Sequence, residues 1–240
     1  MSIAVIPDMH GSTNWKCVMD SNYDYLVSLG DWFDGEGTAD EQIQNFIEFM
    51  EYVKKDPSKR FALIGNHDYQ YITPVKSYTG KMQFDSAEKI GRAIRTYLPY
   101  MRIVVVLNGI AFSHAGLTKT WMRRKSVDLI NAKILAKDLN FIKKDYATDD
   151  SGNDVYQGPL WVRPPSLLRD SAFEYQVVGH TCLAKNKTPV FAKFGSHHVI
   201  FTDSFTKDCV IKFDSDNVDC LPWQEIYNPE REYYKRYTLL

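Results

Sequence analysis

The chain has 240 residues, a hydrophobic fraction of 44% and a formal net charge of −1 at pH 7. Acidic and basic residues are interspersed, so no overall field attracts nucleic acid or an anionic membrane, and we expect stable binding to neither. No stretch approaches the roughly 18 apolar residues of a membrane span, and the N-terminus lacks the pattern of a signal peptide. We therefore expect a cytoplasmic protein. Its four cysteines show no C-x-x-C pair and should remain reduced thiols: Cys17, Cys182, Cys209 and Cys220.

Strand and helix patterns alternate in the first half of the chain. Apolar runs typical of strands occur at residues 3–6, 25–29 and 61–64. Helices are predicted at residues 15–19, 38–57 and 85–97. Thr38 and Glu41 form a capping box, and apolar residues then recur at helical spacing up to Pro57, so this helix should pack on a sheet. Residues 69–84 lack clear periodicity and are predicted to be a long loop of the kind that often contacts a substrate.

The second half of the chain is richer in β-structure. Residues 102–107 and 110–113 flank Asn108-Gly109, which predicts a hairpin because Asn-Gly suits the primed turns that match strand twist. A helical region is expected at 119–144. Short β-rich runs should form a second sheet, at residues 175–178, 190–194, 197–202 and 209–213. Residues 206–240 are interpreted as a strand and tail that extend a single domain of residues 1–240.

Polar side chains follow five of the predicted strands, at the point where each strand ends. Of the six histidines in the chain, four stand in such places, which makes coincidence implausible. Ligands of α/β proteins gather at the carboxyl ends of strands, so these side chains are the candidate functional site. They are Asp8, His10, Asp31, Asp34, Asn66, His67, Asp68, His114 and His180.

These residues lie in an ordered series of motifs. They are D-x-H at 8–10, G-D-x-x-D at 30–34, G-N-H-D at 65–68, H-A-G-L at 114–117 and G-H at 179–180. The series resembles the signature of the calcineurin-like metallophosphoesterases, and H-A-G-L together with W-V-R-P at 161–164 resembles the bacterial and phage branch of the serine/threonine phosphoprotein phosphatases. The resemblance covers about residues 1–205. It implies an α/β fold, a four-layer αββα sandwich of two mixed β-sheets flanked by helices.

The resemblance also implies two divalent metal ions. Asp8 and His10 would hold the first ion, and Asp31 would bridge both ions. Asn66, His114 and His180 would complete the second site. Mixed nitrogen and oxygen ligands suit manganese, with iron or zinc as alternatives, better than magnesium or calcium. Two such ions lower the pKa of a shared water and favour in-line attack at phosphorus.

Three further residues receive catalytic roles from the family pattern. His67 would be the general acid, Asp34 would orient it, and Arg163 would bind the phosphate. Two departures from the pattern stand out: Cys182 occupies the place of a histidine that many relatives have, and Gly35 follows Asp34 where the phosphoprotein branch usually has a phosphate-binding arginine. Cys182 is therefore either a thiolate ligand of the first ion or not a ligand, in which case water completes that site.

The leading interpretation is a metal-dependent phosphoesterase that hydrolyses phosphomonoesters, with phosphoserine or phosphothreonine on proteins as the expected substrate. Its partner would be a phosphorylated protein or a small phosphoester. One alternative is a dinucleoside polyphosphate (diadenosine tetraphosphate) hydrolase or phosphodiesterase. A second alternative, of another class, is an inactive scaffold with the same fold that binds proteins. The sequence leaves the oligomeric state open.

Overall fold

The structure is a computed structural model that describes residues 1–20, 22–73, 81–144, 152–182, 190–203, 211–214 and 221–222. Within these ranges no helix has the length and hydrophobicity needed to cross a membrane. Of the predicted extension at 206–240, two short strands are described. Cys209, Cys220 and the rest of the extension lie outside the described residues.

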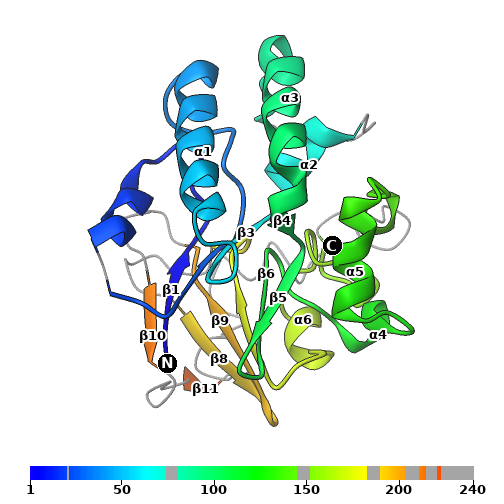
Figure 1. The fold of residues 1–240 in the computed structure, drawn as a ribbon. Coiled ribbons are helices and arrows are strands. Elements are labelled where there is room, and N and C mark those ends of the chain that lie inside the picture. The colour runs from blue at the N-terminus through cyan, green and yellow to red at the C-terminus, as the bar shows by residue number, and fades with distance from the viewer. Residues whose placement is uncertain are drawn as a thin grey trace.

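Two β-sheets form the centre of the fold (Figure 1). The first has the strand order β10 (Ile211–Asp214), β1 (Ser2–Ile6), β2 (Tyr25–Ser28), β3 (Arg60–Leu63) and β4 (Met101–Arg102). Its neighbours β1 to β4 are parallel, and β10 is antiparallel to β1. The second, mixed sheet has the order β11 (Leu221–Pro222), β8 (Val190–Phe194), β9 (His197–Phe201), β7 (Tyr175–Val178), β6 (Ile110–Ser113) and β5 (Val104–Leu107).

The sheets pack face to face through alternate residues of their strands. In β1, Ile3 and Val5 point toward the second sheet, whereas Ala4 and Ile6 point toward the helices, as the two-residue period of a strand requires. All four side chains are buried, so both faces of the first sheet are covered. The residues of the second sheet in the same cluster as Ile3 are Val105, Phe112, Val177, Ile200 and the partly buried Leu107, Ile110 and Phe191.

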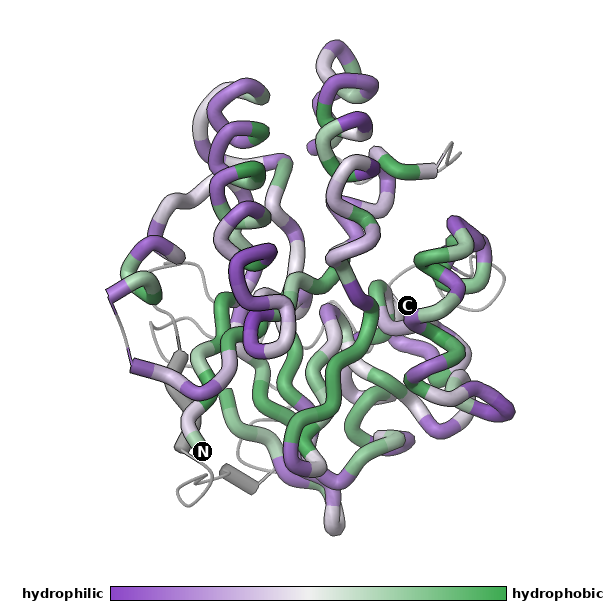
Figure 2. The backbone as a smooth tube through the Cα atoms, in the orientation of Figure 1, coloured by the Kyte–Doolittle hydropathy of each residue, from purple (hydrophilic) through white to green (hydrophobic). Residues whose placement is uncertain are grey.

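Helices cover the outer faces of both sheets. Helices α1 (Ala39–Lys54) and α3 (Ala87–Tyr97) lie side by side over the first sheet, and α6 (Ser166–Arg169) packs on the second (Figure 1). Along α1 and α3 hydrophobic and hydrophilic residues alternate, whereas the strands between the layers are mostly hydrophobic (Figure 2). The predicted arrangement of two sheets flanked by helices is therefore confirmed.

The capping box predicted before α1 is present. The Thr38 hydroxyl accepts a hydrogen bond from the backbone N–H of Glu41 at 3.3 Å, and the Glu41 carboxylate accepts one from the backbone N–H of Thr38 at 2.7 Å. The short helix expected at 15–19 is a 3₁₀ helix, η1 (Asn14–Asp20). The expected helical region at 119–144 consists of α4 (Lys119–Met122), α5 (Val127–Leu135) and the 3₁₀ turn η4 (Asn140–Ile142).

The loop predicted for residues 69–84 is wrong at both of its ends. Helix α2 (Asn66–Ile72) occupies its start, and the 3₁₀ turn η2 (Phe84–Ser86) includes its last residue; residues 74–80 lie outside the described ranges. Gly65 precedes α2 with extended backbone, and the Asp68 carboxylate accepts its N–H at 3.0 Å. This bond closes the first turn of a helix whose apolar pattern is too short to be read from the sequence.

The strand predicted at 102–107 is divided between the two sheets. Ile103 separates β4 from β5, so the chain crosses from the first sheet to the second over one residue. The side chain of Asn131 accepts the backbone N–H groups of Ile103 and Val104 at 3.0 and 3.3 Å and donates to the Val104 carbonyl at 2.8 Å. These bonds replace the strand pairing that the backbone loses at the crossing.

Sheet membership differs from the prediction in one more place. The strand expected at 209–213 does not join the second sheet, contrary to the prediction: β10 pairs with β1 at the edge of the first sheet. The hairpin of β5 and β6 is present and antiparallel, as predicted, and both of its strands belong to the second sheet.

Candidate active site

The ends of strands from both sheets meet at one rim, where the predicted site residues come together. Asp8, Asp31 and Asn66 follow the ends of β1, β2 and β3, and His114 and His180 follow those of β6 and β7. The Asn66 side-chain oxygen lies 2.7 Å from His114 Nε2 and 2.8 Å from His180 Nδ1. Donor atoms from the two sheets therefore converge on one place.

Four of the predicted site residues have left-handed backbone, which is uncommon for residues other than glycine. They are His10, Asp31, Asp34 and His180, with φ of 46°, 54°, 68° and 58°. Neighbouring loops hold this conformation: the backbone N–H of His10 donates to the Asp31 carbonyl at 2.7 Å, and the N–H of His180 donates to the Asp8 carboxylate at 2.9 Å. Such strained backbone persists where surrounding contacts fix it, and it clusters at functional sites.

Among the described residues, two groups of side chains could hold a cation, and Asp31 belongs to both. In one group the donor atoms of Asp31, His10 and His67 lie within 4.8 Å of one another, and in the other those of Asp31, Asp8 and His114 do. Asp31 Oδ2 lies 3.7 Å from His10 Nε2 and 3.5 Å from His114 Nε2. These separations exceed good hydrogen-bond lengths and are compatible with ligands of a shared ion. The position of Asp31 is the one that a bridging ligand needs.

The histidine rings are held so that particular nitrogens face the cluster. His10 Nδ1 lies 2.8 Å from the Phe33 carbonyl oxygen, and His114 Nδ1 lies 2.9 Å from the Leu29 carbonyl oxygen. A proton on Nδ1 satisfies each carbonyl and leaves the lone pair of Nε2 toward Asp31, which is the usual outer-shell arrangement of metal-binding histidines. His180 presents Nδ1 instead, and the backbone of Trp161 hydrogen-bonds its ring.

Burial sets the charge state of these groups. Burial lowers the pKa of His114, and burial together with the charge of Arg163 lowers the pKa of His180 well below its usual value, so both rings are neutral, the form that binds metals. Neutral imidazoles, an amide oxygen and buried carboxylates form a donor set that fits divalent transition-metal ions.

Asp68 holds the loop that carries Asp31. Its two carboxylate oxygens accept the backbone N–H groups of Asp31 and Trp32, each at 2.8 Å, in addition to that of Gly65. Asp68 is fully buried, and burial together with the charge of Asp31 raises its pKa to about 7. A cation beside Asp31 would relieve this repulsion between two buried carboxylates.

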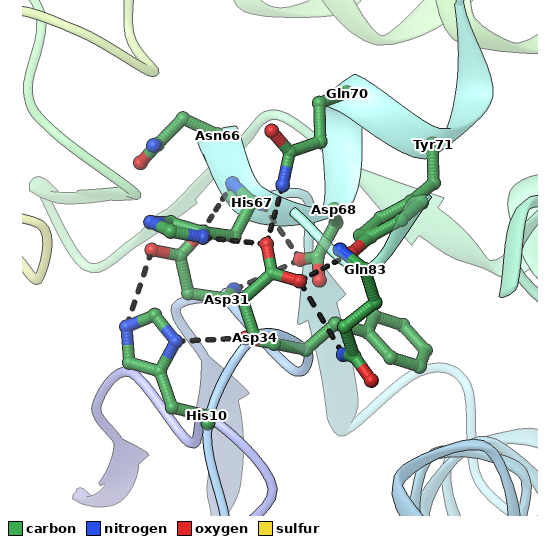
Figure 3. Close-up of polar contacts among 12 residues, drawn as sticks. His10, Asp31, Asp34, Asn66, His67, Asp68, Gln70, Tyr71 and Gln83 are labelled. Atoms are coloured by element: carbon green, nitrogen blue, oxygen red, sulfur yellow. Dashed lines mark hydrogen bonds and ion pairs between the residues drawn. The ribbon is translucent and has the colours of Figure 1, made fainter. Parts of the chain in front are cut away.

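His67 and Asp34 form the pair that the family pattern implies. His67 Nδ1 lies 2.8 Å from Asp34 Oδ2, and the His67 side chain keeps 15% of its surface exposed (Figure 3). Burial alone would lower the pKa of His67, but the charges of Asp31 and Asp34 and the hydrogen bond to Asp34 raise it overall. The pair can therefore hold a proton at a place that a substrate can reach.

Arg163 lies on the His180 side of the site. Its guanidinium donates to the His180 carbonyl at 3.1 Å and to the Thr181 hydroxyl at 3.3 Å, and it is partly exposed. The neighbouring Cys182 is half-buried and belongs to neither of the two candidate groups found among the described residues.

The loop after Asp34, which lacks the expected arginine, folds back over the D-x-H motif at 8–10. The backbone N–H of Glu36 donates to the His10 carbonyl at 2.7 Å, and the Gln42 side chain donates to the carbonyls of Gly35, Glu36 and Gly37. A cleft of about 530 Å³ opens beside this loop. Its lining residues are Asp34, Gly35, Glu36, Lys81 and Gln83.

Three polar residues around Asp34 were missed by the sequence interpretation. Gln70 and Tyr71 come from α2, and Gln83 comes from the segment before η2 (Figure 3). The available signal was spacing: Gln70 and Tyr71 stand three and four residues after His67, so on a helix all three share one face. The predicted loop at 69–84 has no helix face, so this spacing carries no meaning under that prediction.

The chain matches the family model for calcineurin-like phosphoesterases over residues 1–184. It belongs to the calcineurin-like phosphoesterase family, which makes it a metal-dependent phosphoesterase, as predicted. A comparison with curated proteins found no match.

Two solved structures are similar to this chain at low sequence identity. A cold-active protein-tyrosine phosphatase from a psychrophilic Shewanella species is 21% identical, with a TM-score of 0.58, over 86% of this chain and 72% of its own. A metallophosphoesterase from Sphaerobacter thermophilus is 14% identical, with a TM-score of 0.43, over 85% of this chain and 77% of its own. The Shewanella protein supports the fold, and neither comparison bears on the substrate.

Proposed function

We propose that this phosphoesterase hydrolyses phosphomonoesters, with phosphoserine and phosphothreonine on proteins as its principal substrates. The observation that carries the proposal is the hydrogen bond between His67 and Asp34 beside the carboxylate of Asp31. It joins a proton donor to a cluster suited to cations, which is the combination that cleavage of a phosphate ester with a poor leaving group requires.

Two divalent ions, with manganese favoured and iron or zinc as alternatives, would be held in the proposed site. Asp8, His10 and Asp31 would hold one, and Asp31 would share the other with Asn66, His114 and His180. When bound, such ions lower the pKa of a shared water and polarise the phosphoryl oxygens.

The protein's own residues would do the remaining work. Arg163 would bind the nonbridging oxygens of the phosphoryl group from the His180 side. As water adds to phosphorus and the bond to the ester oxygen breaks, His67 Nε2 would give its proton to the leaving oxygen. Asp34 on Nδ1 stabilises the charged ring before that transfer. The products are inorganic phosphate and the free hydroxyl group.

Glu36 favours a second candidate, hydrolysis of a dinucleoside polyphosphate such as diadenosine tetraphosphate, or of a phosphodiester. It lines the cleft beside Asp34, one residue after the position at which the phosphoprotein branch usually has an arginine. A carboxylate there repels a dianionic monoester more than a diester, which carries one charge fewer.

An activity panel on the manganese-loaded protein tests the proposal. The substrates are p-nitrophenyl phosphate, its bis-ester, diadenosine tetraphosphate, and peptides with phosphoserine, phosphothreonine or phosphotyrosine, the last included because of the name of the Shewanella neighbour. We expect the highest kcat/KM on the phosphoserine and phosphothreonine peptides. A preference for the bis-ester or the dinucleotide would select the second candidate, and metal binding without any hydrolysis would favour the scaffold.

Glu36→Arg provides a matched variant for the panel. It restores the type of charge found in the phosphoprotein branch, so the ratio of monoester to diester hydrolysis should rise. An unchanged ratio would mean that the side chain at position 36 does not face the phosphate.

A further inference from the structure

Asp34 is held by far more than its bond to His67. The carboxylate is buried, its backbone is left-handed, and it accepts hydrogen bonds from several side chains (Figure 3). Oδ2 accepts from His67 and from Gln70 Nε2. Oδ1 accepts from the Tyr71 hydroxyl and, at 3.4 Å, from Gln83 Nε2. The two oxygens thus have separate partners, and only one of them faces the imidazole.

Tyr71 is fixed on several sides. Its side chain is only 5% exposed, and its ring meets the edge of the Phe33 ring at a centroid distance of 5.9 Å. Its hydroxyl accepts the backbone N–H of Gln83 at 2.8 Å, which leaves the phenolic proton for Asp34. Burial and the contact with Asp34 also raise the pKa of Tyr71, so the phenol stays protonated and acts as a donor.

The helix that carries His67 also determines the direction of this contact. Tyr71 stands one turn after His67 on α2, so both side chains reach Asp34 from one helix face. The Asp34 carboxylate accepts hydrogen bonds at both oxygens from side chains of α2. It therefore cannot rotate away from the His67 ring without breaking one of these bonds. The Tyr71 hydroxyl is the better held of the two donors to Oδ1, because the Gln83 contact is long.

We propose that Tyr71 is a positioning residue for the proton donor: by holding Asp34 Oδ1, it keeps Oδ2 on His67 Nδ1 and so keeps Nε2 directed at the leaving group. The inference rests on the proposed role of His67. The Tyr71 hydroxyl bonds to Asp34 and to the backbone of Gln83, so Tyr71 acts on His67 through Asp34.

Tyr71→Phe tests the inference, because it removes the hydroxyl and keeps the ring. General acids contribute about 10²- to 10⁴-fold, and Tyr71→Phe should remove only part of that contribution, so we expect kcat on a phosphoserine peptide to fall about 10-fold while KM changes less than about twofold. The loss on p-nitrophenyl phosphate should be clearly smaller, since a good leaving group needs little protonation. Equal losses on both substrates, or none, would overturn the proposal.

Tyr69→Phe is the matched control. Tyr69 lies on the same helix, is equally buried, and donates its hydroxyl to the Leu139 carbonyl at 3.2 Å, away from Asp34. It should change hydrolysis of the two substrates by the same small factor. A dependence on leaving group in Tyr69→Phe would mean that any loosening of α2 produces the effect, which would also overturn the specific role of Tyr71.

A second measurement needs no turnover and separates this inference from the proposed function. Nitrogen-15 NMR of the imidazoles in zinc-loaded protein should show His67 protonated at Nδ1 with a slowly exchanging proton. In Tyr71→Phe that proton should exchange faster or the two tautomers should mix. If the wild-type protein hydrolyses no monoester but this difference is present, the proposed function fails and the positioning role stands. Identical His67 spectra in the two proteins would remove the positioning role whatever the activity.

Discussion

The backbone N–H of His67 donates to Asp31 Oδ1 at 2.8 Å, while Asp31 Oδ2 faces the imidazoles of His10 and His114. One carboxylate therefore positions the proposed proton donor with one oxygen and shares the proposed metal site with the other. Replacing His67 should therefore impair protonation of the leaving group and keep the bound metal, whereas replacing Asp31 should remove the metal as well.

Asp31→Asn should remove nearly all activity together with bound metal. The amide lacks the charge that two cations require of a shared ligand, but it preserves the size of the side chain, so the fold should survive. Elemental analysis of purified protein measures the metal, and circular dichroism checks the fold. Asp40→Asn, at an exposed pair with Lys89, is the control that should keep its metal. Two full equivalents in Asp31→Asn would contradict the bridging role.

His67→Asn should keep both metals and lose about 10²- to 10⁴-fold in turnover on poor leaving groups, the usual contribution of a general acid. The smaller loss is expected on p-nitrophenyl phosphate. His197→Asn is the control, because His197 does not follow an apolar strand and lies beside Lys119. Equal losses on a phosphoserine peptide and on p-nitrophenyl phosphate would remove His67 from this role.

Asp68→Asn should raise the free energy of unfolding of the metal-free protein at alkaline pH. Burial and the charge of Asp31 raise the pKa of Asp68 to about 7, so above that pH the folded state contains a buried charge that the amide removes. The gain should shrink as the pH falls below the pKa, because the wild-type carboxyl is then protonated. Urea unfolding on both sides of the pKa measures the change, and Asp138→Asn, which breaks an exposed pair with Lys133, should change stability by less than about 1 kcal/mol. A loss of stability in Asp68→Asn at alkaline pH would show that the hydrogen bonds from Asp31, Trp32 and Gly65 outweigh the repulsion.

Arg163→Ala should reduce monoester turnover on the order of 10²-fold, as loss of one preorganised donor to a phosphoryl oxygen typically does. Arg163→Lys keeps the charge but not the planar fork and should recover only part of the loss. The control is Arg169→Ala, an exposed arginine on α6. Steady-state kinetics that leave Arg163→Ala unimpaired would assign phosphate binding to other groups.

Local patterns in the sequence predicted most of the fold. Apolar runs gave the strands of both sheets, and Thr38 with Glu41 gave the start of α1, because these signals depend on near neighbours. The crossing at Ile103 could not be predicted, since residues 103–107 form one uninterrupted apolar run after Arg102 and the change of sheet depends on Asn131, which is distant in sequence. The pairing of β10 with β1 is likewise a long-range contact with no local signature.

Site residues that directly follow a strand could be predicted from the sequence. Residues that hold another side chain in place could not. Asp31 and His114 follow apolar runs, so their position shows in the sequence. Tyr71 and Gln83 act on Asp34 through tertiary contacts, and neither residue type indicates such a role by itself. Supporting residues of this kind can be identified only when two things are known: which residues share a helix face, and which distant segments the fold brings next to them.

The site takes ligands from both sheets, and this gives a bound cation a mechanical role. Asn66 follows a strand of the first sheet and His180 follows a strand of the second, so an ion held between them would be a reversible crosslink between residues 114 positions apart in the chain. Crosslinks between distant residues restrict the unfolded chain, and ligands that bind only the folded state add stability as their concentration rises. The same ions that equip the protein for hydrolysis would then clamp its two sheets together, so that loss of metal and separation of the sheets become a single thermodynamic event.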